Sequence, residues 1–164
     1  MNTRAASPTR FAGTALMLLL LGLALTPMQA DAQAQGPYYY YPLTPCRFVD
    51  TRDATLQGGS GPLPRFVNVP FTAKGHCGIP FDAKAVSINV TVVSPTGAGF
   101  LTMFPTGVAR PWISVIDWAS TDNALANGAI VPLGSMTSGE LSAYHETDGG
   151  GTVHLILDAT GYFK

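Results

Sequence analysis

The most regular alternation of hydrophobic and polar residues in this chain covers residues 85–93. Four valine or isoleucine side chains at the even positions alternate there with serine, asparagine and threonine. Because successive side chains of a strand point to opposite faces of a sheet, this segment predicts a strand with one apolar and one polar face. The loop at 94–99 contains a proline and two glycines and permits a reversal. The run at 100–104 returns, so we predict a β-hairpin over residues 85–104.

Shorter runs predict the remaining strands, which cover residues 45–52, 65–71, 112–118, 129–133, 140–146 and 152–158. Residues 148–151 separate the last two runs and predict a second hairpin, whereas residues 121–128 are typical of a polar turn. Pro132 predicts that its strand lies at a sheet edge. About eight short strands and no convincing helix predict an all-β fold, a single antiparallel β-sandwich or jelly-roll-like domain.

The first of these runs ends in a charged pair. Asp50 and Arg52 share the parity of Phe48, whose side chain we expect to point inward. The strand is therefore predicted to end or bulge near Asp50. We expect Asp50 and Arg52 to form a structural ion pair or to stabilise the turn, and binding of a ligand by the two residues is the alternative.

The N-terminal part of the chain predicts a secretory signal peptide at residues 1–34. Two arginines precede an apolar run at 15–25, and Ala-x-Ala sites follow. The run is shorter than the ~20 apolar residues that span a bilayer, with an uncleaved anchor as the alternative. We expect a secreted or periplasmic protein with no membrane span after cleavage. An extended Tyr/Pro-rich arm (35–44), packed on its own domain or paired along a sheet edge, would precede the sandwich domain (45–164).

Composition narrows the partners of this domain. Residues 35–164 hold seven Lys and Arg against nine Asp and Glu, a formal charge of −2, which gives no electrostatic reason to bind nucleic acid. Charged residues are 12% of the chain, against about 25% in ordinary domains. An even cysteine count in an exported protein indicates a disulfide between Cys46 and Cys77, with two free buried thiols as the alternative.

Four segments of the chain resemble a family of secreted bacterial β modules. The segments are PCRFVDTR, INVTVVSPTGAGFLTMFP, ANGAIVPLG and HLILDATGYF, and they follow the family's order from Pro45 to Phe163. The resemblance implies an extracellular β-sandwich, and the family pattern includes Cys46 and Cys77. In this family of unknown function the module occurs alone, in tandem or attached to exported proteins. It offers no catalytic residues to transfer, and we expect a single copy here.

Catalytic and metal-binding patterns are weak in this sequence. Serines and three histidines are present, but Gly-x-Ser-x-Gly does not occur. We therefore expect no enzyme and no cofactor, with a small secreted hydrolase as the alternative. If Thr147 faces Thr152 in the second hairpin, His145 faces His154, and two imidazoles about 5 Å apart at Cβ would form a weak transition-metal site or a pH switch.

Three aromatic residues are the best candidates for ligand binding. Trp112 and Trp118 share the parity of one predicted strand. With Tyr144 they would form a platform that stacks on sugar rings, and burial of both tryptophans in the core is the alternative. We expect a non-enzymatic exported surface or matrix module that binds polysaccharide or a cell-surface protein. The alternative within this class is a structural subunit that forms homo-oligomers through the tyrosine arm.

Overall fold

The structure is a computed structural model that describes residues 36–135 and 139–164. The predicted signal peptide lies outside the described residues. The strands are β1 (Tyr40–Asp50), β2 (Val69–Phe71), β3 (Ala85–Val93), β4 (Gly99–Pro105), β5 (Ile116–Trp118), β6 (Ala124–Pro132), β7 (Leu141–Thr147) and β8 (His154–Phe163), and a short 3-10 helix, η1 (Asp148–Gly150), precedes β8. Within these residues, no helix has the length and apolar character needed to cross a bilayer.

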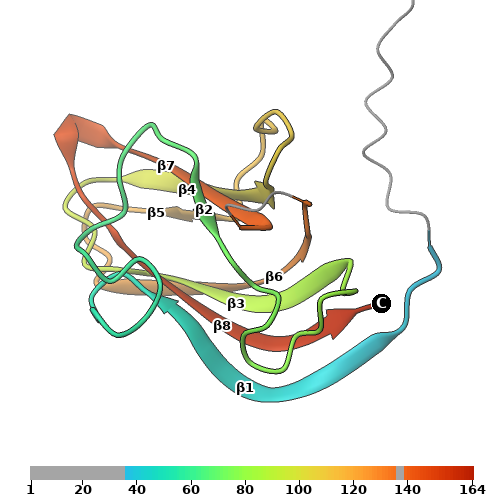
Figure 1. The fold of residues 1–164 in the computed structure, drawn as a ribbon. Helices are drawn as coiled ribbons and strands as arrows, with labels where there is room; N and C mark the ends of the chain where they lie inside the picture. Colours follow the sequence, from blue (N-terminus) through green and yellow to red (C-terminus); the bar gives the residue numbers. More distant parts are fainter. Residues whose placement is uncertain (1–35, 136–138) are drawn as a thin grey trace, which may run out of the picture. The chain divides into compact units, whose positions relative to one another are not determined.

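The strands form two antiparallel sheets that face each other (Figure 1). Sheet A has the order β1-β8-β3-β6, and sheet B has the order β2-β7-β4-β5. The first strand pairs with the last, the second with the second-last, and so on: β1 with β8, β2 with β7, β3 with β6 and β4 with β5. The chain is thus one long hairpin rolled into a jelly roll, with the β4–β5 connection at its tip. The predicted all-β antiparallel sandwich is confirmed.

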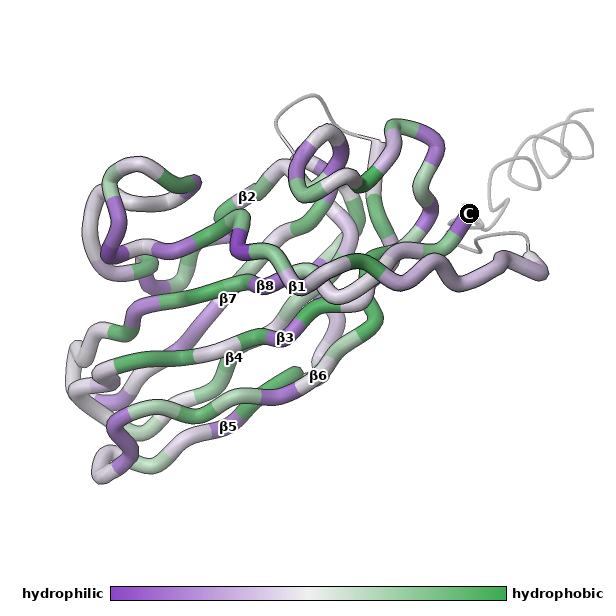
Figure 2. Tube along the Cα trace, turned by 90° about the horizontal axis from the view of Figure 1, so that it is seen from below, coloured by the Kyte–Doolittle hydropathy of each residue, from purple (hydrophilic) through white to green (hydrophobic). Residues whose placement is uncertain are grey.

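Strand β3 forms the most regular part of the core. Its even-numbered side chains, from Val86 to Val92, are at most 1% exposed, and the odd-numbered ones are half-buried. The same hydrophobic cluster contains Leu101, Met103 and Leu141 from sheet B. Figure 2 shows the hydrophobic colouring along β3, β4 and β8. Burial of each such aliphatic side chain contributes roughly 1.5–3 kcal/mol before the loss of conformational entropy.

Both predicted hairpins are wrong. β3 lies in sheet A and β4 in sheet B, and β8 and β7 are divided in the same way. The two connections are arches between the sheets, and they contact each other. Thr96 donates its backbone N–H to Thr152 O over 3.0 Å, and Asp148 donates to Ala98 O over 2.8 Å. An alternating pattern is the same whether the next strand lies beside the first or across the core, so alternation alone does not assign the sheet.

Several strand boundaries also differ from those predicted. Only residues 116–118 of the predicted strand 112–118 are extended, as β5, and only residues 69–71 of the run 65–71 form β2. Residues 124–128, predicted to be a turn, belong to β6. β6 is an edge strand of sheet A, as Pro132 predicts.

Residues 40–44 of the predicted arm are the first part of β1. Tyr40 lies opposite Phe163 and Tyr41 opposite Tyr162 on β8, and the rings of each pair are 5.1 Å apart. This segment therefore packs on its own domain, where it is part of an edge strand of sheet A.

The end of β1 matches the sequence prediction. β1 ends at Asp50, and its register with β8 shifts between Arg47 and Val49. Asp50 is 4% exposed and accepts hydrogen bonds from the backbone and guanidinium of Arg52 at 2.7 to 3.0 Å. Hydrogen bonding from the Arg52 side chain lowers the pKa of Asp50 to about 2. Arg52 and Asp50 thus lock the turn that follows the strand.

The predicted disulfide between Cys46 and Cys77 is confirmed. It links β1 to the loop between β2 and β3 across 31 residues of sequence. In the chain-entropy model, closing a loop of this length stabilises the fold by roughly 3.5–4 kcal/mol.

Candidate functional site

The connection between β4 and β5, residues 106–115, carries the most exposed aromatic side chain. We call it the Trp112 loop. The loop folds back over the outer face of sheet B, the face turned away from sheet A. Thr102 Oγ1 donates to Ile113 O over 2.7 Å, and the Val115 N–H donates to Leu101 O over 2.8 Å. β4 therefore fixes the position of the second half of the loop.

An arginine holds two aromatic rings together at this site. The Arg110 guanidinium lies 4.0 Å from the ring centroid of Tyr144 on β7 and 4.7 Å from that of Trp112. A guanidinium over an aromatic face is attracted by the negative charge above the ring, by about 0.5–2 kcal/mol. Tyr144 donates its hydroxyl to Glu146 Oε1 over 2.7 Å, and burial together with this hydrogen bond raises the pKa of Tyr144. We call Trp112, Arg110, Tyr144 and Glu146 the Arg110 stack.

The members of the Arg110 stack differ in exposure. Trp112 is 90% exposed, whereas Tyr144 is 9% exposed and lies on the sheet beneath the arginine. Nearly the whole indole surface is thus open to a ligand, while its orientation depends on Arg110. Glu146 and the exposed Asp117 both lie opposite Phe100 in the sheet register, so two carboxylates share this face. The arrangement can stack on an apolar ring face and accept hydrogen bonds from hydroxyl groups.

The predicted ligand-binding role of Trp118 is corrected by its burial. Trp118 is 5% exposed and belongs to the hydrophobic core. Its Nε1–H donates to Gly97 O over 2.9 Å, which satisfies the indole inside the sandwich. Trp112 and Trp118 do not share a face, because residues 112–115 are not part of a strand. Trp112 and Tyr144 are brought together by Arg110, a residue that no sequence motif selects.

The predicted histidine pair does not form. His145 lies on β7 in sheet B and His154 on β8 in sheet A. His145 is fully buried: Nε2 donates to Leu63 O over 2.8 Å, and Nδ1 accepts from the Thr147 hydroxyl over 3.0 Å. Burial lowers the pKa of His145. Nδ1 of His154 is instead 2.8 Å from Thr51 Oγ1.

The described part of the chain holds no group of three or more His, Cys, Asp or Glu side chains placed to bind a metal ion. The metal site predicted at His145 and His154 is not formed, because the two histidines lie in different sheets and do not face each other.

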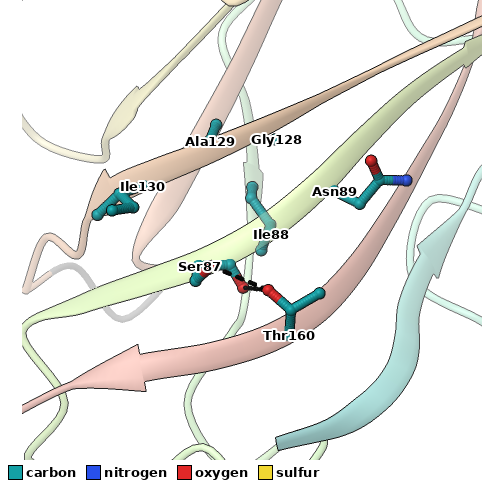
Figure 3. Close-up of a pocket in the computed structure, with 7 residues that line it drawn as sticks. All are labelled: Ser87, Ile88, Asn89, Gly128, Ala129, Ile130 and Thr160. Carbon is teal, nitrogen blue, oxygen red and sulfur yellow. Dashed lines mark hydrogen bonds between the residues drawn. The ribbon is translucent and has the colours of Figure 1, made fainter. Parts of the chain in front are cut away.

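A second feature, a shallow depression, lies on the outer face of sheet A (Figure 3). It is lined by Ser87, Ile88, Asn89, Gly128, Ala129, Ile130 and Thr160. The Ser87 and Thr160 hydroxyls point toward each other and are 2.9 Å apart. The depression adjoins another at Arg47, where the guanidinium holds both Asp158 oxygens at 2.8 and 3.1 Å. These polar groups bond one another, so they offer a ligand less than the open indole of Trp112 does. The polar residues at positions 87 and 89 of β3 predict from the sequence that this face of the strand is not part of the core.

In comparisons with known proteins, no family model, no curated protein and no solved structure matches this chain.

Proposed function

We propose that this protein is a non-enzymatic, exported module that binds polysaccharide through the Trp112 loop. The observation that carries the proposal is the state of Trp112, which is 90% exposed and stacked against Arg110. A large apolar side chain that stays in water contributes none of the free energy that burial would provide to the fold. Its free face instead offers a flat apolar surface of about the size of a sugar ring, which requires no rearrangement on binding.

The surroundings of Trp112 favour a sugar over a protein as the ligand. A stable protein interface buries about 800 Å² on each partner around a desolvated core. Exposed Asp117 and half-buried Glu146 lie on this face of sheet B, and two such carboxylates oppose a dry interface. They suit hydroxyl groups, which donate hydrogen bonds to carboxylate oxygens while the sugar stays partly in water.

Export is the second part of the proposal. The N-terminal pattern of arginines, apolar run and Ala-x-Ala sites supports it. The disulfide between Cys46 and Cys77 fits an oxidising compartment, because such bonds are rare in the cytosol. A resemblance to secreted bacterial β modules points in the same direction.

Co-sedimentation tests the binding proposal. The oxidised protein is spun with insoluble polysaccharides and bacterial cell walls, beside Trp112→Ala and the matched control Phe81→Ala. Phe81 is 80% exposed on another loop, so its loss removes an equally visible ring away from the Trp112 loop. We expect wild type and Phe81→Ala to pellet with at least one polymer and Trp112→Ala to remain in solution, with all three folded by circular dichroism.

Other outcomes would contradict the proposal in specific ways. Equal pelleting of the Trp112→Ala protein would remove the Trp112 loop from the binding site. Loss of pelleting after protease treatment of the cell walls would favour a protein partner. Release of reducing ends from a pelleted polymer would support the alternative of a small hydrolase.

A further inference from the structure

The two sheets have four edge strands, and three of them are protected against pairing with another chain. β1 carries Pro42, Pro45 and two register shifts. β2 and β5 are three residues long, and they contain Pro70 and Asp117, respectively. Short length, proline, irregular register and charge are the devices by which proteins prevent an edge strand from joining a second sheet.

β6 lacks these devices over most of its length. It has nine residues, none of them charged, and pairs with β3 without a register shift from Ala124 to Pro132. Its only proline is the last residue. Figure 2 shows β6 beyond β3 at the margin of sheet A, and no described strand pairs with its other edge. Leu125 and Ile130 on this strand are 38% and 63% exposed.

The direction of the backbone groups identifies which part of β6 is free to pair. The Leu133 N–H donates to Lys84 O, toward β3. Because N–H groups alternate along a strand, those of Ala124, Ala126, Gly128 and Ile130 point away from β3. Pro132 falls at an outward position and has no N–H. The free edge therefore extends from Ala124 to Ile130.

We propose that β6 pairs antiparallel with β6 of a second copy of this chain, with Asn127 on the two-fold axis. In this register Ile130 lies opposite Ala124 of the other copy, and Leu125 lies opposite Ala129. Each large exposed side chain meets a small one, on both faces of the joined sheet. Every outward N–H between Ala124 and Ile130 gains a carbonyl partner, and no charge is brought against a like charge.

The pairing closes after two copies. A two-fold axis uses the same edge of both chains, so the free edge of β6 is consumed, and the remaining edges are β1, β2 and β5 with their protecting features. The product is a dimer with one continuous sheet of eight strands rather than a fibre. This inference rests on the backbone edge of β6 and not on polysaccharide binding. Asn127 Nδ2 donates to Val115 O of the Trp112 loop over 2.7 Å, a side-chain contact that leaves the outward backbone groups of β6 free.

The first test uses two substitutions at one glycine. A Cβ at Gly128 would meet no heavy atom within 4 Å, so the fold admits a larger side chain there. The full chain, expressed under oxidising conditions, is examined by sedimentation equilibrium as wild type, Gly128→Lys and Gly128→Ala. We expect a two-fold larger mass for wild type and Gly128→Ala than for Gly128→Lys, because only lysine brings charge to the edge. A monomeric wild type at all concentrations, or a dimeric Gly128→Lys, overturns the proposal.

The second test measures the register. Directly opposed residues that do not exchange hydrogen bonds have Cα atoms about 4.5 Å apart, within reach of a disulfide. In the proposed register that pair is Asn127 with its own copy. We expect Asn127→Cys to form a covalent dimer on mild oxidation, and Ala126→Cys and Gly128→Cys to remain monomers on a non-reducing gel. Cross-linking through position 126 or 128 instead would refute this register.

Discussion

The two tryptophans of this protein lie six positions apart in sequence and serve opposite purposes. Trp118 is 5% exposed, belongs to the core and donates its indole N–H to Gly97 O. Trp112 is 90% exposed and contacts Arg110 at the tip of the rolled hairpin. The first satisfies its apolar and polar parts within the fold, and the second leaves its apolar surface in solvent, where the proposed ligand would stack. Residue type alone therefore does not separate a core tryptophan from a candidate binding residue; burial and hydrogen bonding do.

The largest effect that tests this contrast is the loss of Trp118. We expect Trp118→Ala to lower the free energy of unfolding by about 3–5 kcal/mol, because it leaves a cavity and an unsatisfied Gly97 carbonyl. Trp112→Ala should change the free energy of unfolding by about 0.5 kcal/mol or less. Urea unfolding of both variants measures the difference, and equal destabilisation would contradict the assignment of the two roles.

A second contrast concerns two of the arginine–carboxylate pairs, Arg52 with Asp50 and Arg110 with Glu146. Arg52 binds Asp50 at 2.7 Å, whereas Arg110 Nη2 is 3.9 Å from Glu146 and lies mainly against aromatic rings. The pKa of Asp50 falls from 3.8 to about 2 in the fold. A depressed carboxyl pKa adds stability above pH ~4, and this stability is lost as the pH falls toward ~2.

Removal of each carboxylate charge tests this second contrast. We expect Asp50→Asn to cost about 2 kcal/mol at neutral pH and to flatten the acid side of the stability curve, measured by urea unfolding from pH 7 to pH 2. Glu146→Gln should cost about 0.5 kcal/mol or less, because its contact with Arg110 is long, at 3.9 Å, and the glutamate side chain is 39% exposed. A large loss for Glu146→Gln would mean that the Arg110 stack is structural.

The third prediction concerns the effect of pH on stability, which we expect to depend on His145 in the core and not on the Trp112 loop. His145, whose ring centroid lies 6.5 Å from that of Trp118, has a pKa lowered from 6.5 by burial. The unfolded chain therefore binds the proton more tightly than the fold, and stability declines as the pH falls below ~6.5. We expect a Tm that drops between pH 7 and pH 5 in wild type and drops less in His145→Gln. An unchanged pH slope in the variant would show that another group controls this range.

A change in stability smaller than that of Trp118→Ala follows the loss of Arg110. Arg110→Ala should lower the free energy of unfolding by about 1–2 kcal/mol, because the arginine side chain is only 18% exposed and packs on two aromatic rings. It should weaken polymer binding, because the indole of Trp112 loses the contact that orients it. Arg110→Lys keeps the charge without the planar group and should restore binding only in part. Full binding by Arg110→Ala would show that the stack has no role in orienting Trp112.

The contrast between the tryptophans also shows how far sequence reasoning extends. The alternation of β3 correctly predicts which side chains are buried, because period two is a local property of the strand. It does not predict that β3 and β4 lie in different sheets, because an arch and a hairpin preserve the same alternation. The edge position of β6 was predictable, because Pro132 has no N–H to donate to a neighbouring strand.

The candidate site was predicted only in part, for a related reason. Trp112 and Tyr144 were selected as aromatic residues, but the inclusion of Trp118 depended on a strand that begins four residues later than predicted. Arg110 gives no signal in sequence, because its contact with Tyr144 joins the β4–β5 connection to strand β7, two segments far apart along the chain. Such non-local contacts become visible only when the order of strands is known.

Fluorescence of single-tryptophan proteins tests the central claim most directly. Trp118→Phe leaves Trp112 as the reporter, and Trp112→Phe leaves Trp118. We expect iodide to quench Trp112 strongly and soluble fragments of the bound polysaccharide to shift its emission and protect it from quenching. Trp118 should show blue-shifted emission, little quenching and no response to the fragments. A protected Trp112 in the free protein, or a response to the fragments from Trp118 alone, would contradict the account.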